Sequence, residues 1–202
     1  MIKINYDLKF QEIVKNLNGK PSLLLHSCCG PCSSSVLARV KEFFDVTVIY
    51  YNPNIYPQQE YLKRKNEQIR FLKETSIKFL DCEYEQEKFY ECAKGLEQEK
   101  EGGARCSKCF LLRLEKTATK AKESGFDFFG TTLTVSPHKN AQLINKIGEI
   151  LQDKHNIKYL YSDFKKQNGY LNSIKLSKEY NLYRQEYCGC EFSLKESKKD
   201  NL

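Results

Sequence analysis

The sequence predicts an α/β fold, in which a single domain holds a parallel β-sheet flanked by helices. Short apolar runs typical of buried strands alternate with longer segments of helical periodicity along the chain. A length of 202 residues suits one domain of this class. We find no internal repeat and no low-complexity linker, so we expect residues 1–202 to form one domain.

The first half of the chain predicts a leading helix and then alternating strands and helices. Residues 5–17 carry apolar side chains at helical spacing, and a Gly-Lys-Pro sequence closes this leading segment, 1–21. The runs SLLLH, VTVIYY and IKFL are apolar or β-branched and predict strands at 22–26, 46–51 and 77–80. Amphipathic patterns predict helices at 33–44, 58–75 and 84–95.

The second half continues the alternation after a connector rich in Glu, Lys and Gly. Helical patterns at 107–124 and 140–154 alternate with strand patterns at 126–132 and 157–161. The remainder, 162–202, is polar and aromatic, with one helix expected at 173–180. We interpret it as a C-terminal extension that carries its own cysteines.

The chain has the features of a cytoplasmic protein. No apolar stretch approaches the roughly 20 residues needed to cross a bilayer, so we expect no membrane association, and the polar N-terminus does not resemble a secretion signal. Nine cysteines in a reducing compartment favour metal binding or redox chemistry over a framework of structural disulfides.

The charge is unevenly distributed. The net charge is +7, yet residues 81–101 hold eight acidic and three basic side chains, which leaves +12 on the rest of the chain. A basic surface of this size suits an anionic partner such as RNA, although many soluble proteins reach the same value.

Seven of the nine cysteines fall into three short groups, at 28–32 (CCGPC), 106–109 (CSKC) and 188–190 (CGC). The first group follows a predicted strand and the second lies near a helix start, where backbone N–H groups favour thiolates. In a parallel sheet the ligand crevice lies beyond the carboxyl ends of the strands, so both groups are expected to face one crevice. Cys82 and Cys92 stand apart, and we expect them to be buried as small hydrophobic residues.

The spacing alone leaves three chemistries open. Cys29-Gly-Pro-Cys32 matches a thioredoxin-like dithiol, two C-x-x-C pairs suit structural zinc, and adjacent Cys28 and Cys29 suit an iron–sulfur cluster. The spacing favours the cluster over zinc, and zinc over the dithiol. Cys188-Gly-Cys190 would close a small, strained disulfide that is easily reduced, or hold a second metal.

Other polar residues are expected near the same crevice. Tyr51, Asn52 and Tyr56 follow the second strand, where a tyrosine could either stack on an unpaired base or pack on the sheet. Lys139 follows the fourth strand, and Asp163, Lys165 and Lys166 follow the fifth. His26 ends the first strand, where it is either an active-site residue or a hydrogen-bonded residue of the strand end.

The sequence resembles one known family through an ordered set of motifs that spans residues 23–193. The motifs are HSCCGPCS (26–33), YNPNIYP (51–57), EYLKRK (60–65), ARCSKCFLLRLEKTA (104–118), TTLTVSPHKN (131–140) and SDFKKQNGYLNSIKLSKEYNLYRQEYCGCEFS (162–193). This set is similar to that of the cobalamin-independent epoxyqueuosine reductase family QueH. The resemblance implies a fold related to the adenine-nucleotide α-hydrolases, which are Rossmann-like, and reduction of the epoxide of epoxyqueuosine to queuosine in tRNA.

The resemblance also implies roles for the cysteines. Cys28, Cys29, Cys106 and Cys109 are expected to bind a [4Fe-4S] cluster, and Cys188 with Cys190 to form a redox-active pair. Cys32 with Asp163 is the candidate ligand pair for a second metal ion, iron or zinc. His26 or a tyrosine at the rim is the candidate acid for the leaving oxygen.

The resemblance further implies the partners. The substrate is expected to be tRNA for Tyr, His, Asn and Asp, in which the modified base occupies the wobble position. We expect its phosphates to meet Lys165, Lys166, Lys175, Lys178 and Arg184. An electron donor is required as well. A thioredoxin-like oxidoreductase and a zinc-stabilised tRNA-binding module are the alternative functions.

Overall fold

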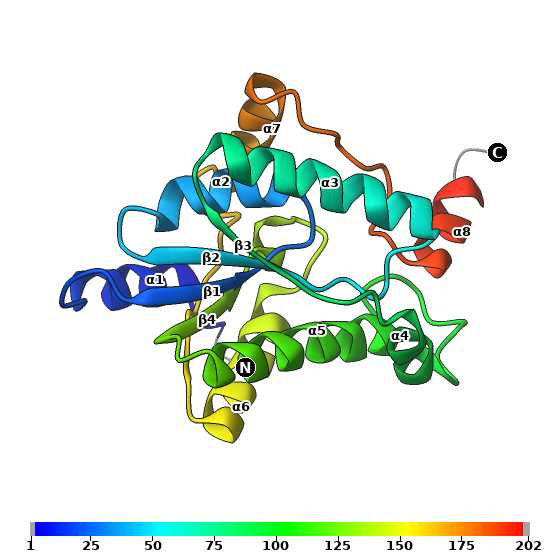
Figure 1. Ribbon diagram of the computed structural model, residues 1–202. Coiled ribbons are helices and arrows are strands. Elements are labelled where there is room, and N and C mark those ends of the chain that lie inside the picture. Colours follow the sequence, from blue (N-terminus) through cyan, green and yellow to red (C-terminus); the bar gives the residue numbers. More distant parts are fainter. Residues whose placement is uncertain (1–2, 200–202) are drawn as a thin grey trace.

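A five-stranded, all-parallel sheet forms the centre of the molecule in the computed structural model, which describes residues 3–199. Residues 1–2 and 200–202 of the expected domain lie outside the described range. The strand order is β3-β2-β1-β4-β5, and Figure 1 labels the first four of these strands. The strands are β1 (Ser22–His26), β2 (Asp45–Tyr50), β3 (Lys78–Asp81), β4 (Phe128–Thr131) and β5 (Lys158–Tyr159). The predicted α/β fold is confirmed.

The helices fall close to the predicted segments. They are α1 (Tyr6–Lys15), α2 (Gly30–Val40), α3 (Gln58–Glu74), α4 (Gln86–Ala93), α5 (Ala104–Glu123), α6 (Ala141–His155), α7 (Gly169–Glu179) and α8 (Glu191–Lys199), with a 3₁₀ turn η1 (Leu133–Val135). Within residues 3–199, none of these helices is long and apolar enough to cross a membrane.

The helices cover the sheet on both faces (Figure 1). On one face, side chains from α2, α3 and the segment after α7 form an apolar core with Leu23, Leu25 and Val48. On the other face, α5 and α6 pack on Leu24, Ile49 and Phe129. The alternation of side chains along a strand sends neighbouring leucines of β1 to opposite cores.

Helix boundaries near the cysteines differ from the prediction. Helix α2 begins at Gly30 rather than at 33, with Cys29 as its N-cap and proline in its first turn, where the missing N–H costs nothing. Helix α5 begins at Ala104 rather than at 107. Both cysteine groups therefore lie in the opening turns of helices. Helix α8 was not expected from the sequence, which predicted one helix in the C-terminal extension.

The parallel register brings the carboxyl ends of the central strands together. His26, the last residue of β1, is paired with Ile49 of β2 and with Thr131 of β4. The segments that follow these strands hold Cys28 and Cys29, Tyr51 and Asn52, and Thr132 to Lys139. Residues far apart in the sequence therefore meet at one edge of the sheet.

Glu85 directly precedes the acidic helix α4 and forms ion pairs with both α4 and α5. Helix α5 carries the second cysteine group. The Glu85 carboxylate accepts a hydrogen bond from Lys116 of α5 at 2.9 Å and pairs with Lys88 of α4. Burial raises the pKa of this carboxyl, but the hydrogen bonds from Lys88 and Lys116 outweigh it and bring the pKa to about 2. A carboxyl whose pKa is lowered on folding stabilises the protein above its ordinary pKa and stops doing so as the pH falls through the folded value.

We therefore expect Glu85→Gln to lower the free energy of unfolding at neutral pH by about 1–3 kcal/mol. The difference from the wild type should shrink as the pH falls from about 5 to about 2, since protonation removes the same charge. Urea unfolding across this range measures it. The control is Glu123→Gln, at an exposed partner of Lys120, which should change little. A difference that stays constant with pH would contradict this account.

Candidate functional site

A cavity of about 580 Å³ opens at the carboxyl edge of the sheet. It lies between the start of α2, the segment after η1, and residues 180–190, which we call the C-terminal strap. The residues that line it include Cys28, Cys32, Lys139, Arg184, Gln185 and Cys188. The first and third cysteine groups thus face one cavity, whereas Cys106 and Cys109 of the second group, which were expected at the same crevice, are not among its lining residues.

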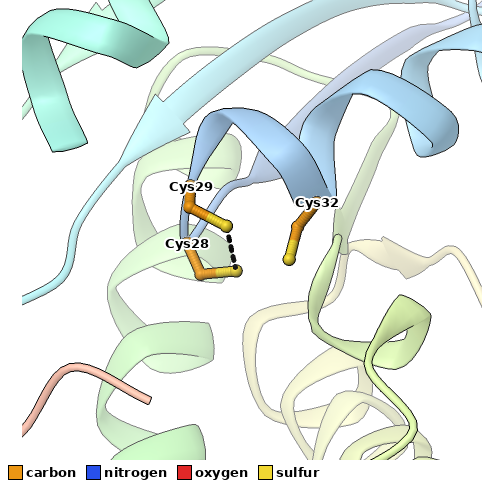
Figure 2. A group of neighbouring side chains, drawn as sticks. All are labelled: Cys28, Cys29 and Cys32. Atoms are coloured by element: carbon orange, nitrogen blue, oxygen red, sulfur yellow. Dashed lines mark hydrogen bonds between the residues drawn. The ribbon is translucent and has the colours of Figure 1, made fainter. Parts of the chain in front are cut away.

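Cys28, Cys29 and Cys32 form a compact group at the start of α2. Figure 2 shows the three side chains gathered at the opening turn of the helix. Their sulfurs all lie within 4.8 Å of one another, and those of Cys28 and Cys29 are 3.7 Å apart. Gln185 of the strap donates a hydrogen bond to the Cys29 sulfur at 3.1 Å. Three soft donors at this spacing could hold a metal ion.

The group loses its first proton easily. Hydrogen bonds from Cys29 and Cys32 lower the pKa of Cys28 well below its usual value, and the charges of Lys139 and Arg113 act in the same direction. The hydrogen bond to Cys28 raises the pKa of Cys29 to about 12, and the pKa of Cys32 rises for the same reason. One thiolate stabilised by two thiols is a favourable starting state for binding a metal.

Cys106 and Cys109 occupy the first turns of α5. The Cys106 sulfur accepts a hydrogen bond from the Gly102 N–H at 3.2 Å. Cys109 is buried in an apolar cluster with Cys190 and Phe89, and burial raises its pKa to about 12. The structure therefore brings Cys109 beside a cysteine of the strap, while the compact sulfur group at α2 contains neither Cys106 nor Cys109.

Arg113 connects the two groups. Its side chain is 2% exposed and extends from α5, one turn after Cys109, whose sulfur lies 4.0 Å from a terminal guanidinium nitrogen. The guanidinium also donates to Asn52 Oδ1 at 2.5 Å and to His26 Nε2 at 3.3 Å. Its pKa is raised: burial opposes the charge, but the nearby Cys109, Cys28 and Cys188 favour it. A fixed positive charge thus lies among cysteines of all three groups.

His26 is a buried residue of the strand end. Nδ1 lies 3.0 Å from Thr131 Oγ1, and Nε2 lies 3.1 Å from the Tyr51 carbonyl oxygen. Complete burial and the charge of Arg113 lower its pKa to about 3, so the ring is neutral at pH 7. It does not line the cavity. These features favour a positioning role over the proton-donating role considered from the sequence.

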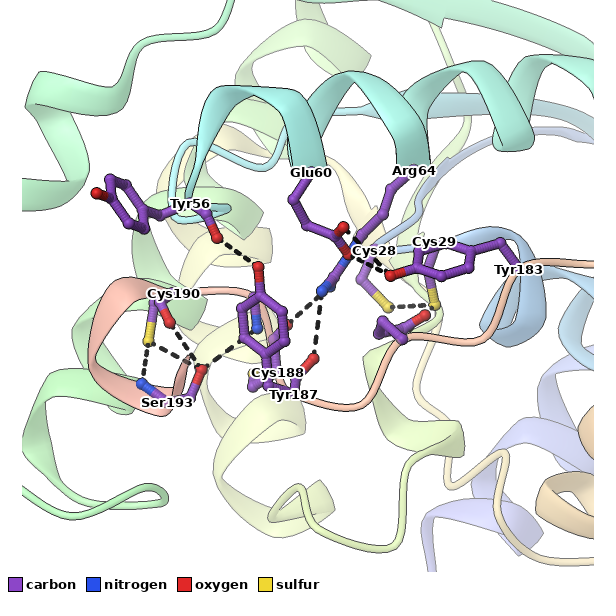
Figure 3. Close-up of polar contacts among 12 residues, drawn as sticks. Cys28, Cys29, Tyr56, Glu60, Arg64, Tyr183, Tyr187, Cys188, Cys190 and Ser193 are labelled. Carbon is purple, nitrogen blue, oxygen red and sulfur yellow. Dashed lines mark hydrogen bonds and ion pairs between the residues drawn. The ribbon is translucent and has the colours of Figure 1, made fainter. Parts of the chain in front are cut away.

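The strap supplies Cys188 to the cavity and Cys190 to the apolar cluster behind it. Both are free thiols, as are all nine cysteines, which lie within the described residues. Cys190 contacts Ser193 at the start of α8, and Arg64 of α3 donates hydrogen bonds to the strap backbone (Figure 3). Burial raises the pKa of Cys188, while the charge of Lys139 lowers it.

The residues expected to bind substrate differ in burial, and Lys139 among them lines the cavity. Tyr51 and Asn52 are buried beside His26, and Asn52 donates to the Ser27 carbonyl oxygen at 2.8 Å. Tyr56 is partly exposed, and its backbone pairs with Gly189. Lys139 lines the cavity and lies close enough to Cys188 and Cys28 for their charges to raise its pKa against the opposing effect of burial.

Asp163 and the two lysines after it are not among the residues that line the cavity. Asp163 forms an ion pair with Lys165 at 2.9 Å, and neither residue lines the cavity. Lys166 is exposed, as are the side chains of Lys175 and Lys178 on α7. Arg184 is exposed at the cavity rim, where it donates to Ser177.

The two isolated cysteines are half-buried. Cys82 packs against the core under α5, and Cys92 packs in the cluster of Phe89 and Cys109. Burial raises the pKa of both thiols. Both thiols pack against a core, as expected, but they are half-buried rather than buried.

Three site residues were not singled out from the sequence, namely Arg64, Arg113 and Gln185. Arg113 follows Cys109 by four residues, so the two share a helix face, and this spacing is the one available signal. Arg64 and Gln185 act across more than 120 positions of the chain, which no local pattern reveals.

Comparison with known proteins identifies a family. A family model described as epoxyqueuosine reductase QueH matches residues 23–196. A protein of that name from Staphylococcus epidermidis is 46% identical over 95% of this chain and 85% of its own length. Another, from Streptococcus pyogenes, is 45% identical over 96% and 79%. The one from Thermotoga maritima is 36% identical over 88% and 93%.

A solved structure supports the fold. It is the U34-tRNA thiolase NcsA from Methanococcus maripaludis with its [4Fe-4S] cluster. The two folds match with a TM-score of 0.57 and 16% identity, over 96% of this chain and 72% of the other. At that identity the likeness concerns the fold alone.

Proposed function

The chain belongs to the epoxyqueuosine reductase QueH family, and from this membership we propose which residues carry its reaction. The protein is an oxidoreductase of tRNA modification that converts epoxyqueuosine to queuosine. The thioredoxin-like and zinc-module alternatives do not account for this family membership. Removing an epoxide oxygen to leave an alkene takes two electrons and two protons and releases water.

We propose that Cys28, Cys29, Cys106 and Cys109 hold a [4Fe-4S] cluster. The donor chemistry fits, because thiolates are the ligands of such clusters and the compact group already favours a thiolate at Cys28. Arg113 and Lys139 would offset the negative charge of the ligands. Once bound, the cluster supplies electrons singly.

For Cys32 we propose a ligand role toward a second metal ion, iron or zinc, since its sulfur belongs to the compact group and faces the cavity. Asp163 would join it only after leaving its ion pair with Lys165. The proposal therefore rests on Cys32 more than on Asp163.

The cluster proposal predicts that Cys106→Ser abolishes the brown colour of anaerobically purified protein, together with its iron, its sulfide and its activity. The control is Cys82→Ser, at a half-buried thiol outside the three groups, which should keep all four. Metal and sulfide analysis with an absorption spectrum measures the result. A colourless but active Cys106→Ser protein would refute the ligand assignment.

We further propose that Cys188 and Cys190 are the redox-active pair. The observation that carries this proposal is that Cys188 lines the same cavity as Cys28 and Cys32. Oxidation of two thiols to a disulfide releases two electrons and two protons, which matches the demand of the epoxide. A separate electron donor must then reduce the pair again.

Cys188→Ser should therefore leave the iron content unchanged and slow multiple turnover on tRNA carrying epoxyqueuosine by at least about tenfold. The loss follows because a lone Cys190 cannot form the disulfide. Turnover is measured by the appearance of queuosine, with Cys92→Ser as the control at a nearby half-buried thiol. Unchanged turnover would remove the pair from the reaction.

The substrate is a tRNA, and we propose that it carries the base at the wobble position in the Tyr, His, Asn and Asp isoacceptors. A tRNA substrate in turn suggests a cytoplasmic location. We propose that exposed basic residues contact its phosphates, among them Arg184 at the cavity rim and Lys166 in the segment after β5. Lys139 would approach the base itself, since it lines the cavity wall.

Replacing Lys166 and Arg184 together by Gln should weaken tRNA binding and reduce the slope of log affinity against log salt by about two. Lys158→Gln is the control. Lys158 is the first residue of β5 and lies at the amino ends of the strands, whereas the cavity opens at their carboxyl ends. Filter binding across a salt series measures both quantities. An unchanged slope would place the tRNA elsewhere.

A further inference from the structure

The C-terminal strap is held by contacts from several elements. Leu182 packs in the core near Gly30, and Gln185 donates to the Cys29 sulfur. The N–H of Tyr56 donates to the Gly189 carbonyl oxygen at 2.8 Å. The strap therefore connects the compact cysteine group to the pair at 188–190.

Arg64 makes the most specific of these contacts. The side chain reaches from α3 toward the strap, between Glu60 and the backbone at 187–188 (Figure 3). Its Nε pairs with Glu60 at 2.6 Å, and its two terminal nitrogens donate to the carbonyl oxygens of Cys188 at 3.2 Å and Tyr187 at 3.3 Å. One planar guanidinium thus fixes two consecutive peptide groups.

The backbone of the Cys-Gly-Cys turn is shaped around this guanidinium. Gly189 has a φ of +133°, a conformation that favours glycine. A β-carbon there would lie 3.1 Å from a terminal nitrogen of Arg64 and 3.1 Å from Ile55. Glycine between the two cysteines therefore allows both the turn and the close approach of Arg64.

Simple packing would not require this arrangement. Arg64 is only 2% exposed, and burying a charged group is costly unless its hydrogen bonds are well made. The fork geometry of arginine suits two neighbouring carbonyls, and a lysine cannot reproduce it. A requirement to hold Cys188 in one position would account for the cost of burying the Arg64 charge.

We propose that Arg64 is a positioning residue for the reductase reaction. It holds the backbone at Tyr187 and Cys188 so that Cys188 stays on the cavity wall with Cys28 and Cys32. This inference rests on the proposed role of Cys188 in the redox-active pair. Arg64 itself is neither a metal ligand nor an electron donor in this proposal.

Arg70 provides a matched control on the same helix. It also binds the strap, donating to the carbonyl oxygens of Tyr180 and Asn181, and it pairs with Glu67 and Glu74. Its contacts lie at the start of the strap, away from the cysteine pair. Loss of Arg70 therefore loosens the strap without releasing Cys188.

The test compares Arg64→Lys, Arg64→Met and Arg70→Met in the metal-loaded protein. We expect kcat to fall at least about tenfold in Arg64→Met and to a smaller extent in Arg64→Lys, with KM and iron content unchanged. Alkylation of Cys188 by iodoacetamide, followed by mass spectrometry of the peptide, should become several-fold faster because the turn is freed. Arg70→Met should keep the wild-type kcat and alkylation rate while lowering Tm.

Two outcomes would overturn the proposal. One is a wild-type kcat and Cys188 alkylation rate in both Arg64 variants. The other is an equal effect of the Arg64 and Arg70 variants, which would indicate strap stability alone. Arg64→Lys keeps the positive charge. The comparison of this variant with Arg70→Met therefore still decides the question if Arg64→Met does not fold. If Cys188→Ser turns over normally, the redox role fails, and the alkylation rates still report on positioning.

Discussion

Fixed positive charge among clustered thiols is the interaction on which this site depends. Thiolates repel one another, so a site that gathers cysteines from several segments needs nearby cations that are always charged. Arg113 supplies such a charge from within the protein, with Cys28, Cys109 and Cys188 all close enough to affect its pKa. Lys139 adds a second charge from the cavity wall. Asn52 and His26 keep the guanidinium in place, which explains why these polar residues are buried beside the sheet.

The fold was predictable because its signals are local. Alternating apolar runs and helical patterns gave all five strands, and β1 was predicted at its observed bounds. The parallel arrangement also placed the first two cysteine groups at helix starts. Helix boundaries were less predictable, because α2 begins at Gly30 through a proline in its first turn and α5 begins at Ala104 without a side-chain cap.

The site was predictable in its cysteines but not in what orients them. Short cysteine motifs can be recognised directly in a sequence, whereas the burial of Arg64 and Arg113 depends on partners distant along the chain. For Tyr51 and Asn52 the motif was visible in the sequence, but it did not reveal what the two residues contact. Their motif suggested contact with a base, yet the structure uses the Tyr51 carbonyl and the Asn52 amide to surround His26 and Arg113. A polar residue after a strand can serve the ligand or the scaffold, and only tertiary contacts distinguish the two.

The position of His26 bears on how the leaving oxygen obtains its protons. A ring with a pKa of about 3, away from the cavity wall, is a poor proton donor at neutral pH. The proposed chemistry does not need it, because a dithiol that becomes a disulfide releases two protons along with its two electrons. These are the quantities that converting an epoxide to an alkene and water consumes. A dithiol at 188–190 with one member on the cavity wall could therefore meet both demands at one place, provided that its backbone is held there.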